Sequence, residues 1–320
     1  MKTIFVTGTA GFIASNFINY IVKKYPDYFF ISIDKIDYCS NLKNITVLKE
    51  KNHRFFKGNI LNNELMDTIF DEYDINIIIH FAAQSHVDNS FENAFIFIED
   101  NVKATVNLLE YAKKCKNLQK FIHVSTDEVY GEISINDEHC TINTRLNPTN
   151  PYSASKASAE YFVLSYQKSF NIPIIISRGN NVYGPRQFPD KLIPKTIKKL
   201  FDNERMTIHG TGKNYRSFLY VDDVCTAFET IMEKGVVGKI YNIGTEYEVC
   251  NFDVIKKIIE IMKPNEDYKN WIEYVKDRPW NDLRYGVNCD DLLNLGWKEE
   301  YTFDEGLRKT IEWYKNIFVK

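Results

Sequence analysis

The stretch Thr3-Ile-Phe-Val-Thr-Gly-Thr-Ala-Gly-Phe-Ile-Ala14 decides the fold that we expect for this chain. Residues 3–7 form an apolar run typical of a short buried strand, and an amphipathic helix pattern follows the second glycine. Gly8 permits a tight turn, Gly11 lets the backbone approach a pyrophosphate, and the small Ala14 lets the helix pack closely on the sheet. A loose glycine pattern alone is a weak signal, but a strand, a glycine turn and a helix in this order form the dinucleotide-binding arrangement.

The second and third strands end in polar residues that suit the same ligand. Asp34 ends the run 29–34 and is placed to accept hydrogen bonds from ribose hydroxyls, which favours NAD over NADP because a carboxylate repels a 2'-phosphate. The neighbouring Lys35 weakens this inference, and a solvated aspartate at a strand end is the alternative. Asn59 and Ile60 follow the third strand, where Asn59 is placed to meet the adenine edge.

A fourth strand, 75–80, leads into a segment with room for a cofactor. The small residues Ala82 and Ala83 of this segment leave space for the cofactor at the sheet edge. A helix then runs from about residue 94 to 114 and carries Asn101. Its apolar positions recur at helical spacing, which indicates core packing or a dimer face.

Acidic residues follow the fifth strand, in the stretch His123-Val-Ser-Thr-Asp-Glu-Val-Tyr-Gly131. Ligands of open α/β sheets bind beyond the carboxyl ends of the strands, so Thr126, Asp127 and Glu128 emerge at such a site. Two acids there can serve as proton donor and proton acceptor if their environments separate their pKa values. A turn with a polar N-cap is the alternative interpretation.

Tyr152 and Lys156 lie four residues apart near the start of a helix that reaches about Phe170, so they share one helix face. A nearby ammonium, helped by a cationic nicotinamide ring, lowers the pKa of a phenol. We therefore interpret Tyr152 as a general base and Lys156 as its partner and a ribose anchor. The spacing is common by chance, and only the upstream glycine turn makes it significant.

The βα rhythm weakens after a sixth strand at 172–177. We expect an α/β fold: a Rossmann-type doubly wound parallel sheet with a smaller, discontinuous α/β substrate-binding domain at the C-terminal side. The NAD-binding domain covers 1–180 and is re-entered at about 218–245, and 181–320 is mainly the substrate domain. Arg216 and Arg278 suit a diphosphate because a guanidinium fork matches phosphate oxygens; surface arginines are the alternative.

Composition excludes several classes of protein. The net charge of -3 over 320 residues gives no field for binding nucleic acid. The six cysteines are scattered, which is typical of free thiols in a reducing compartment. The histidines show no metal-ligand spacing, and no segment approaches the roughly 18 apolar residues of a membrane span. We expect a cytoplasmic protein without metal, nucleic-acid or membrane partners.

Together these motifs resemble the extended short-chain dehydrogenase/reductase superfamily, and within it the nucleoside-diphosphate-glucose 4,6-dehydratases, over essentially the whole chain. The Thr126-Asp-Glu128 triplet is the specific element, because the sister 4-epimerases share the Tyr/Lys pair but lack the acids. The matching segments are Thr7–Ala14, His86–Asp88, Ser125–Gly131, Tyr152–Lys156, Asn181–Pro185, Lys191–Pro194 and Asp277–Pro279.

Two subfamilies compete within this resemblance: bacterial dTDP-glucose enzymes and UDP-glucose enzymes like the first domain of plant rhamnose synthases. The segments 37–44, 178–181 and 278–282 look more like the second. The dTDP type usually has Gly at Ala14, Asp at Asn59 and a Gly-His pair at 280–281. These departures favour UDP-glucose, with a deoxysugar such as rhamnose downstream.

The resemblance implies a hydro-lyase with tightly bound NAD, catalytic Thr126, Asp127, Glu128, Tyr152 and Lys156, and a homodimer built as a four-helix bundle from helices 94–114 and 152–170. It implies cofactor binding by Gly8, Gly11, Phe12, Ile13, Asp34, Lys35, Asn59, Ile60, Phe81, Ala82, Ala83, Ser85, Asn101, Tyr152, Lys156 and Val182. It implies nucleotide-sugar binding by Ser85, His86, Asp88, Thr126, Asn181, Lys191, Leu192, Ile193, Thr207, Ile208, His209, Arg216, Asn251, Arg278 and Asn281. The alternatives are an NAD-dependent 4-epimerase or a non-catalytic NAD-binding regulator.

Overall fold

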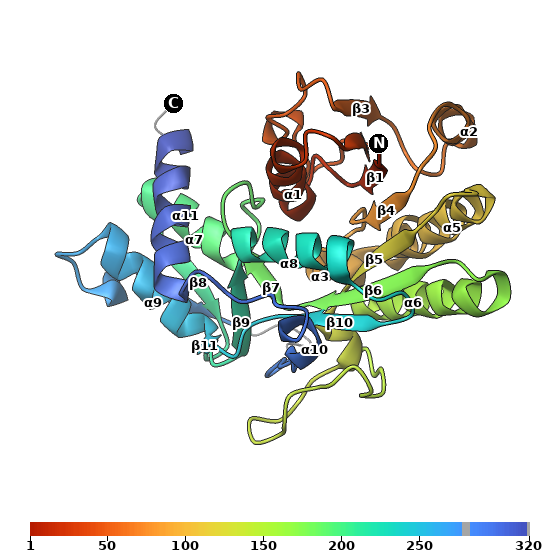
Figure 1. The fold of residues 1–320 in the computed structure, drawn as a ribbon. Helices are drawn as coiled ribbons and strands as arrows, with labels where there is room; N and C mark the ends of the chain where they lie inside the picture. Colours follow the sequence, from red (N-terminus) through yellow and green to blue (C-terminus); the bar gives the residue numbers. More distant parts are fainter. Residues whose placement is uncertain (277–281, 319–320) are drawn as a thin grey trace.

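A parallel sheet of seven strands forms the centre of the molecule (Figure 1). The computed structural model describes residues 1–276 and 282–318. The strand order is β10-β6-β5-β4-β1-β2-β3, which confirms the expected doubly wound α/β fold. The strands are β1 (Thr3–Thr7), β2 (Phe29–Asp34), β3 (His53–Lys57), β4 (Ile77–His80), β5 (Lys120–Thr126), β6 (Ile174–Gly179) and β10 (Ile240–Ile243).

Helices cover both faces of this sheet because its strands are apolar on both sides. In β1, Ile4 and Val6 enter one buried cluster while Phe5 enters the other, as the alternation of side chains along a strand requires. The first cluster lies under α1 (Phe12–Lys24) and α8 (Val221–Lys234). The second lies under α2 (Asn63–Glu72), α5 (Ala104–Lys114) and α6 (Pro151–Phe170).

The helix expected over 94–114 is continuous but widens in its middle. It starts as α4 (Ala94–Phe97), passes through a π-helical segment, η2 (Ile98–Lys103), and continues as α5; the short α3 (Val87–Glu92) precedes it. Asn101 lies in this segment and is buried. Its amide oxygen accepts a hydrogen bond from Gln84 N at 2.7 Å, and its amide nitrogen donates to Gln84 O at 3.0 Å. The wide turn thus secures the segment that follows β4.

A second group of elements packs beside the carboxyl ends of the sheet (Figure 1). Its core contains Tyr183, Ile197, Ile258 and Leu307, all buried. Three strands, in the order β11-β9-β7, form one small sheet, and β8 pairs with β12. The elements are β7 (Asn181–Tyr183), α7 (Leu192–Phe201), β8 (Met206–His209), β9 (Tyr215–Tyr220), β11 (Glu248–Cys250), α9 (Asn251–Met262), η4 (Tyr268–Trp271), β12 (Ile272–Val275) and α11 (Phe303–Phe318).

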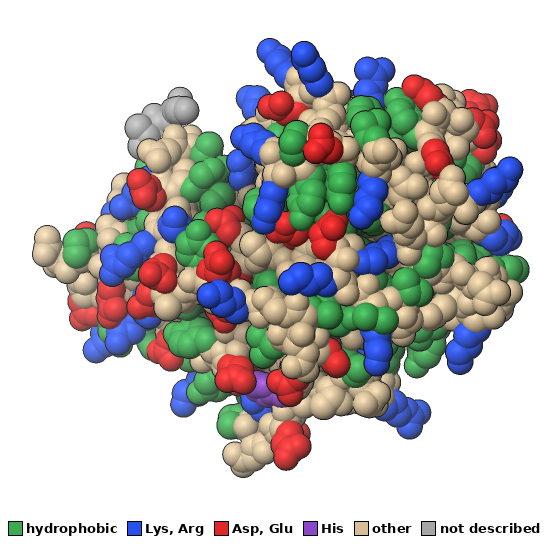
Figure 2. Space-filling model, viewed as in Figure 1, with side chains coloured by type: hydrophobic (Ala, Val, Ile, Leu, Met, Phe, Trp, Pro, Cys, Tyr) green, Lys and Arg blue, Asp and Glu red, His purple; other side chains and the backbone are tan. Residues whose placement is uncertain are grey.

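The chain returns to the main sheet between these elements. After β9, α8 packs against α1, and β10 then pairs in parallel with β6. The remaining short helices are η1 (Leu42–Asn44), η3 (Asp127–Tyr130) and α10 (Asp290–Leu293). On the face drawn in Figure 2, basic and acidic side chains are interspersed. Within residues 1–276 and 282–318, no helix combines the length and apolar character needed to cross a bilayer.

Candidate active site

Two adjoining cavities lie at the carboxyl ends of the central strands. The glycine-turn pocket, of about 260 Å³, is lined by Gly8, Gly11 and Asp34 among others. The acid pocket, of about 390 Å³, is lined by residues that include Asp127 and Glu128. Four of the lining residues that the two pockets share are Ser85, Ser125, Tyr152 and Lys191. The two pockets therefore adjoin at these residues, Tyr152 among them.

The glycine turn leaves space for a phosphate group at the start of α1. Gly8 has a φ of +75°, and a Cβ there would lie 2.8 Å from the backbone of Ala82. Only glycine fits this position. Gly11 is the N-cap of α1 and has no side chain to cap the helix, so first-turn amides are left uncapped, and Gly11, Phe12 and Ile13 line the pocket. The chain's own geometry thus fits a pyrophosphate at this helix end.

Asp34 serves the turn itself as well as lining the pocket. Its two carboxylate oxygens accept hydrogen bonds from Ala10 N at 2.9 Å and Ile36 N at 2.7 Å. Burial raises the pKa of Asp34, against the lowering effect of these bonds. The Lys35 ammonium lies 2.6 Å from Asp100 and 2.9 Å from Asp37. Because those carboxylates balance its charge, Lys35 argues less strongly for a 2'-phosphate than its place in the sequence suggests.

Tyr152 and Lys156 lie on the first turns of α6, as the sequence predicts, and both are buried. Lys156 Nζ donates a hydrogen bond to Val124 O at 2.6 Å, which ties the helix to β5. Burial lowers the pKa of Lys156 to about 8, while Glu160 acts to raise it. In the protein without its cofactor, burial raises the pKa of Tyr152 and the charge of Glu128 raises it further, so the predicted lowering is not present there. The predicted lowering relies on a cationic nicotinamide ring in addition to Lys156.

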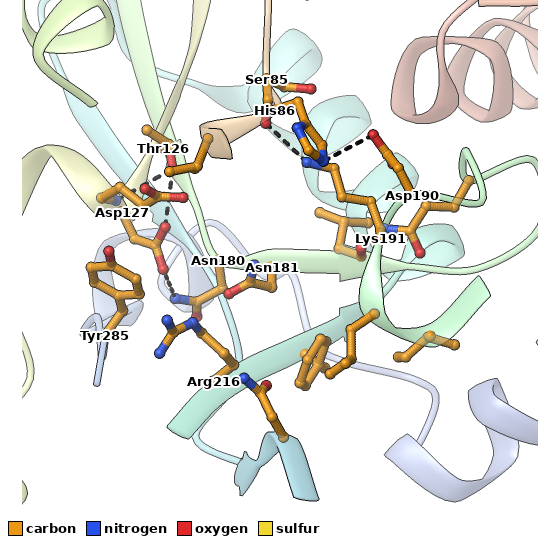
Figure 3. A pocket seen from close by; sticks show the side chains of 18 of the residues that line it. Ser85, His86, Thr126, Asp127, Asn180, Asn181, Asp190, Lys191, Arg216 and Tyr285 are labelled. Atoms are coloured by element: carbon orange, nitrogen blue, oxygen red, sulfur yellow. Dashed lines mark hydrogen bonds and ion pairs between the residues drawn. The ribbon is translucent and has the colours of Figure 1, made fainter. Parts of the chain in front are cut away.

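The acid turn begins where β5 ends. The Thr126 hydroxyl accepts from Glu128 N at 3.3 Å and donates to Asp127 Oδ1 at 3.1 Å. Asp127 Oδ2 accepts from Asn180 Nδ2 at 2.7 Å, at the end of β6 (Figure 3). Glu128 Oε2 accepts from Asn150 Nδ2 at 3.1 Å, just before α6. The two carboxylates are therefore held by different elements.

The two acids also differ in their electrostatics. Burial raises the pKa of Asp127, and hydrogen bonds from Asn180 and Thr126 oppose the rise. Burial and the neighbouring charge of Asp127 raise the pKa of Glu128 to about 7. A carboxyl with a pKa near neutrality can both accept and return a proton at that pH.

The acid pocket carries cations in two places: Lys191 lies beside Ser85, His86 and Asp190, and Arg216 lies near Asn180 and Tyr285 (Figure 3). Lys191 Nζ donates to Ser85 O at 3.0 Å, and His86 Nε2 lies 3.1 Å from Asp190 Oδ2. Arg216 donates to the backbone carbonyl of Asp282 at 2.9 Å, and its guanidinium lies 4.8 Å from the ring centroid of Tyr285. These contacts hold the Arg216 plane in place within the pocket wall.

Most predicted site residues line the pocket in which the sequence places them. The catalytic candidates Thr126, Asp127, Glu128 and Tyr152 line the acid pocket, and Lys156 lines the glycine-turn pocket. Among the cofactor candidates, Val182 lines the acid pocket instead, and Asn101 lines neither. Arg278 and Asn281 lie outside the described residues. The remaining substrate candidates all line the acid pocket: Ser85, His86, Asp88, Asn181, Lys191, Leu192, Ile193, Thr207, Ile208, His209, Arg216 and Asn251.

Sequence reasoning missed Asn150 and Asn180, the two amides that hold the acids. An N-cap position directly before Pro151 was a usable signal for Asn150, since asparagine is a preferred N-cap. Asn180 had no local signal, because its partner lies on another strand. Among the described residues, His, Cys, Asp and Glu side chains form no group of three or more that would hold a metal ion.

Comparisons with known proteins agree with this geometry. The family model described as GDP-mannose 4,6 dehydratase matches residues 5–310. A dTDP-D-glucose 4,6-dehydratase of Dictyostelium discoideum is 48% identical, over 99% of this chain and 82% of its own length. A trifunctional Arabidopsis thaliana protein that includes a UDP-glucose 4,6-dehydratase is 48% identical over 98% of this chain, which spans 47% of that protein.

A solved structure extends the likeness to the fold. The dTDP-glucose 4,6-dehydratase of Bacillus anthracis, crystallised in complex with NAD, superimposes with a TM-score of 0.90 at 39% identity. The match covers 99% of this chain and 97% of that one. The similarity therefore includes both the central sheet and the smaller group of elements beside it.

Proposed function

This chain belongs to the GDP-mannose 4,6-dehydratase family, and from that premise we propose that it is a hydro-lyase that converts a nucleoside diphosphate glucose into its 4-keto-6-deoxy derivative, with NAD as cofactor. The observation that carries the proposal is the position of Asp127 and Glu128 beside Tyr152, where the two pockets adjoin. Elimination of water needs an acid and a base on the two sides of one carbon–carbon bond, in addition to a redox partner.

The residues present fit NAD in the glycine-turn pocket. Gly8 and Gly11 leave room for the pyrophosphate, Asp34 suits the ribose, and Lys156 and Tyr152 stand at the end nearest the acid pocket. When bound, NAD supplies hydride acceptance at the start of the turnover and hydride return at its end. The chain's own groups handle the protons.

Each proton has an assigned carrier in this proposal. Tyr152 takes the proton of the 4-hydroxyl, and the Thr126 hydroxyl turns from Asp127 Oδ1 to donate its hydrogen bond to the same oxygen. Glu128 removes the proton at C5, which the 4-ketone has made acidic. Asp127 protonates the departing 6-hydroxyl, so that one water leaves, and Glu128 then returns its proton to C5. The proton left on Tyr152 balances the one that Asp127 has lost, so exchange with solvent restores both groups.

We infer that the nucleotide is UDP rather than dTDP and that the product is a precursor of rhamnose or another deoxysugar. The inference rests on Ala14, Asn59 and the segments 37–44 and 278–282, which resemble the UDP-glucose enzymes. Arg216 and Lys191 line the acid pocket with positive charge for the diphosphate.

We also propose a division of the chain at about residue 180, with a return to the NAD-binding part at 218–245. The pairing of β10 with β6 supports this division.

We propose further that two copies associate in a four-helix bundle built from the helix that comprises α4, η2 and α5, and from α6. Phe95, Ile98 and Tyr161 are 83%, 53% and 60% exposed, which is unusual for large apolar side chains.

Mass spectrometry of the product tests the proposed reaction. Purified protein is incubated with UDP-glucose and, separately, dTDP-glucose, without added NAD. We expect UDP-glucose to lose the mass of one water. Loss from dTDP-glucose alone would reverse the assignment of the nucleotide. Loss from neither, with NAD bound to the protein, would contradict a dehydratase; conversion to an isomer of unchanged mass would identify a 4-epimerase.

A further inference from the structure

A buried ion pair lies behind the active site. Glu160 of α6 is 0% exposed and Arg178 of β6 is 3% exposed. Arg178 Nη2 donates to Glu160 Oε2 at 2.6 Å, and Arg178 Nε lies 3.1 Å from both carboxylate oxygens. Burying two charges costs several kcal/mol of desolvation per ion, so such a pair adds little stability compared with apolar residues of equal size. Its presence therefore suggests another role.

One side of the pair faces Lys156. Glu160 follows Lys156 by four residues on α6, so the two side chains share a helix face. The Lys156 ammonium donates to Val124 O, and two buried imidazoles, His80 of β4 and His123 of β5, also lie close enough for its charge to affect them. Burial and Lys156 lower the pKa values of both histidines, which keeps them neutral. The charge of Glu160 acts to raise the pKa of Lys156, against the lowering effect of burial.

The other side of the pair faces the acid turn. Arg178 Nη1 donates to Tyr130 Oη at 2.8 Å, and the guanidinium lies 4.8 Å from the Tyr130 ring centroid. Tyr130 ends η3, two residues after Glu128, and its hydroxyl donates to Asn242 Oδ1 of β10 at 2.8 Å. Two residues after Arg178, Asn180 donates to Asp127. The buried Glu160–Arg178 pair thus connects α6, which carries Tyr152 and Lys156, with η3, which carries Asp127 and Glu128.

We propose that Glu160 and Arg178 are positioning residues, which balance the charge of Lys156 and lock the acid turn 127–130 against α6. The proposal rests on the proposed function, because it assigns these residues to an oxidation at Tyr152 and an elimination at Asp127 and Glu128. Neither residue lines either pocket, so both act through others.

The first test removes both charges together, in Glu160→Gln/Arg178→Met, because a single substitution leaves a lone buried charge that can prevent folding. The rate of NADH formation on mixing with nucleotide sugar is followed against pH. Without Glu160 the pKa of Lys156 falls, so its ammonium is lost earlier as pH rises. Removing Arg178 as well offsets part of this change, so we expect the alkaline limb of the profile to move down by a fraction of a pH unit, roughly a two- to threefold loss of rate above it.

Asp223→Asn is the matched control. Asp223 is also fully buried, but it lies in α8, lines neither pocket and accepts hydrogen bonds from Glu300 N and Tyr301 N. We expect it to lower the melting temperature without moving the limb. A folded double variant whose limb coincides with that of the wild type would overturn the charge-balancing role.

Arg178→Lys is the second variant, and it tests the locking role separately from the charges. It keeps both charges but loses the fork that reaches Tyr130. We expect NADH formation to keep its pH profile, while elimination slows several-fold and NADH accumulates during turnover. An unchanged ratio of oxidation to elimination would overturn the locking role. Wild-type protein that releases no dehydrated product would instead refute the proposed function.

Discussion

Asp127 and Glu128 are adjacent in the chain, yet the structure surrounds them differently. Asp127 accepts hydrogen bonds from Asn180 and Thr126, whereas Glu128 accepts one from Asn150 and is affected by the charge of its neighbour. Ionisation of Asp127 makes ionisation of Glu128 less favourable, so the two carboxyl groups lose their protons at different pH values. This difference gives two identical functional groups two separate tasks.

The pKa of Glu128 predicts a pH dependence for the elimination step. Glu128 must be deprotonated to take the C5 proton, and its pKa is raised to about 7. Asp127 must also carry a proton to release the 6-hydroxyl, so the reactive form holds one proton on the pair, and we expect the single-turnover rate of elimination to fall as pH rises above about 7. Asp127→Asn removes the neighbouring charge and leaves Glu128 as the titrating group, so the pKa of Glu128 should fall and the slower reaction should instead rise with pH, with its midpoint below 7. A midpoint that does not move would show that Asp127 has no influence on the titrating group.

Tyr152→Phe and Asp127→Asn should affect different steps. Tyr152→Phe removes the proton acceptor for the 4-hydroxyl, so we expect NADH formation to fall by about 100-fold or more. Asp127→Asn removes only the acid for the leaving hydroxyl, and we expect NADH still to form while release of dehydrated product slows. Stopped-flow absorbance follows the first step and mass spectrometry the second. Equal loss of both steps in Asp127→Asn would contradict this division of roles.

At the scale of elements, one residue at the start of α6 both stabilises the helix and contacts a carboxylate of the candidate active site. Asn150 Oδ1 accepts from Ser153 N at 2.8 Å, and Ser153 Oγ accepts from Asn150 N at 3.2 Å, which makes a capping box. The same Asn150 side chain donates to Glu128. The residue that fixes where α6 begins therefore also fixes the carboxylate opposite Tyr152.

Substitutions at Asn150 separate these two roles. Asn150→Ala should lower the free energy of unfolding by about 1 kcal/mol, and Asn150→Ser should retain most of it, since serine also caps helices. Both variants lose the amide donor that lowers the pKa of Glu128. The limb near pH 7 in the pH profile of elimination should therefore move to higher pH in both variants. Asn62→Ala removes the N-cap of α2, which accepts from Leu65 N at 3.2 Å, and should lower stability without moving the limb. Urea denaturation and the pH profile measure the two effects.

At the scale of the whole molecule, the exposed apolar side chains of α4, η2 and α6 predict a second copy of the chain. We expect the wild type to sediment as a dimer and Phe95→Glu to shift it toward the monomer, because a carboxylate buried in an apolar interface has no partner. Ile317→Glu, on the exposed side of α11 at 48% exposure, should leave the dimer intact. Analytical ultracentrifugation measures the oligomeric state of each variant. A wild type that is monomeric at micromolar concentration would refute the proposed four-helix-bundle dimer.

The sequence by itself determined the features that depend on neighbours along the chain: the glycine turn, the strand ends that carry Asp34 and Thr126, and the four-residue spacing of Tyr152 and Lys156. Periodicity and turn chemistry are local, so they can be read from residues in order. Only the tertiary structure decided that Asn150 and Asn180 hold the acids, that Lys156 bonds to Val124 O, and that the pKa of Tyr152 is raised rather than lowered. Those properties depend on burial and on hydrogen-bond partners from distant segments, which the packing of α6, β5 and β6 brings together.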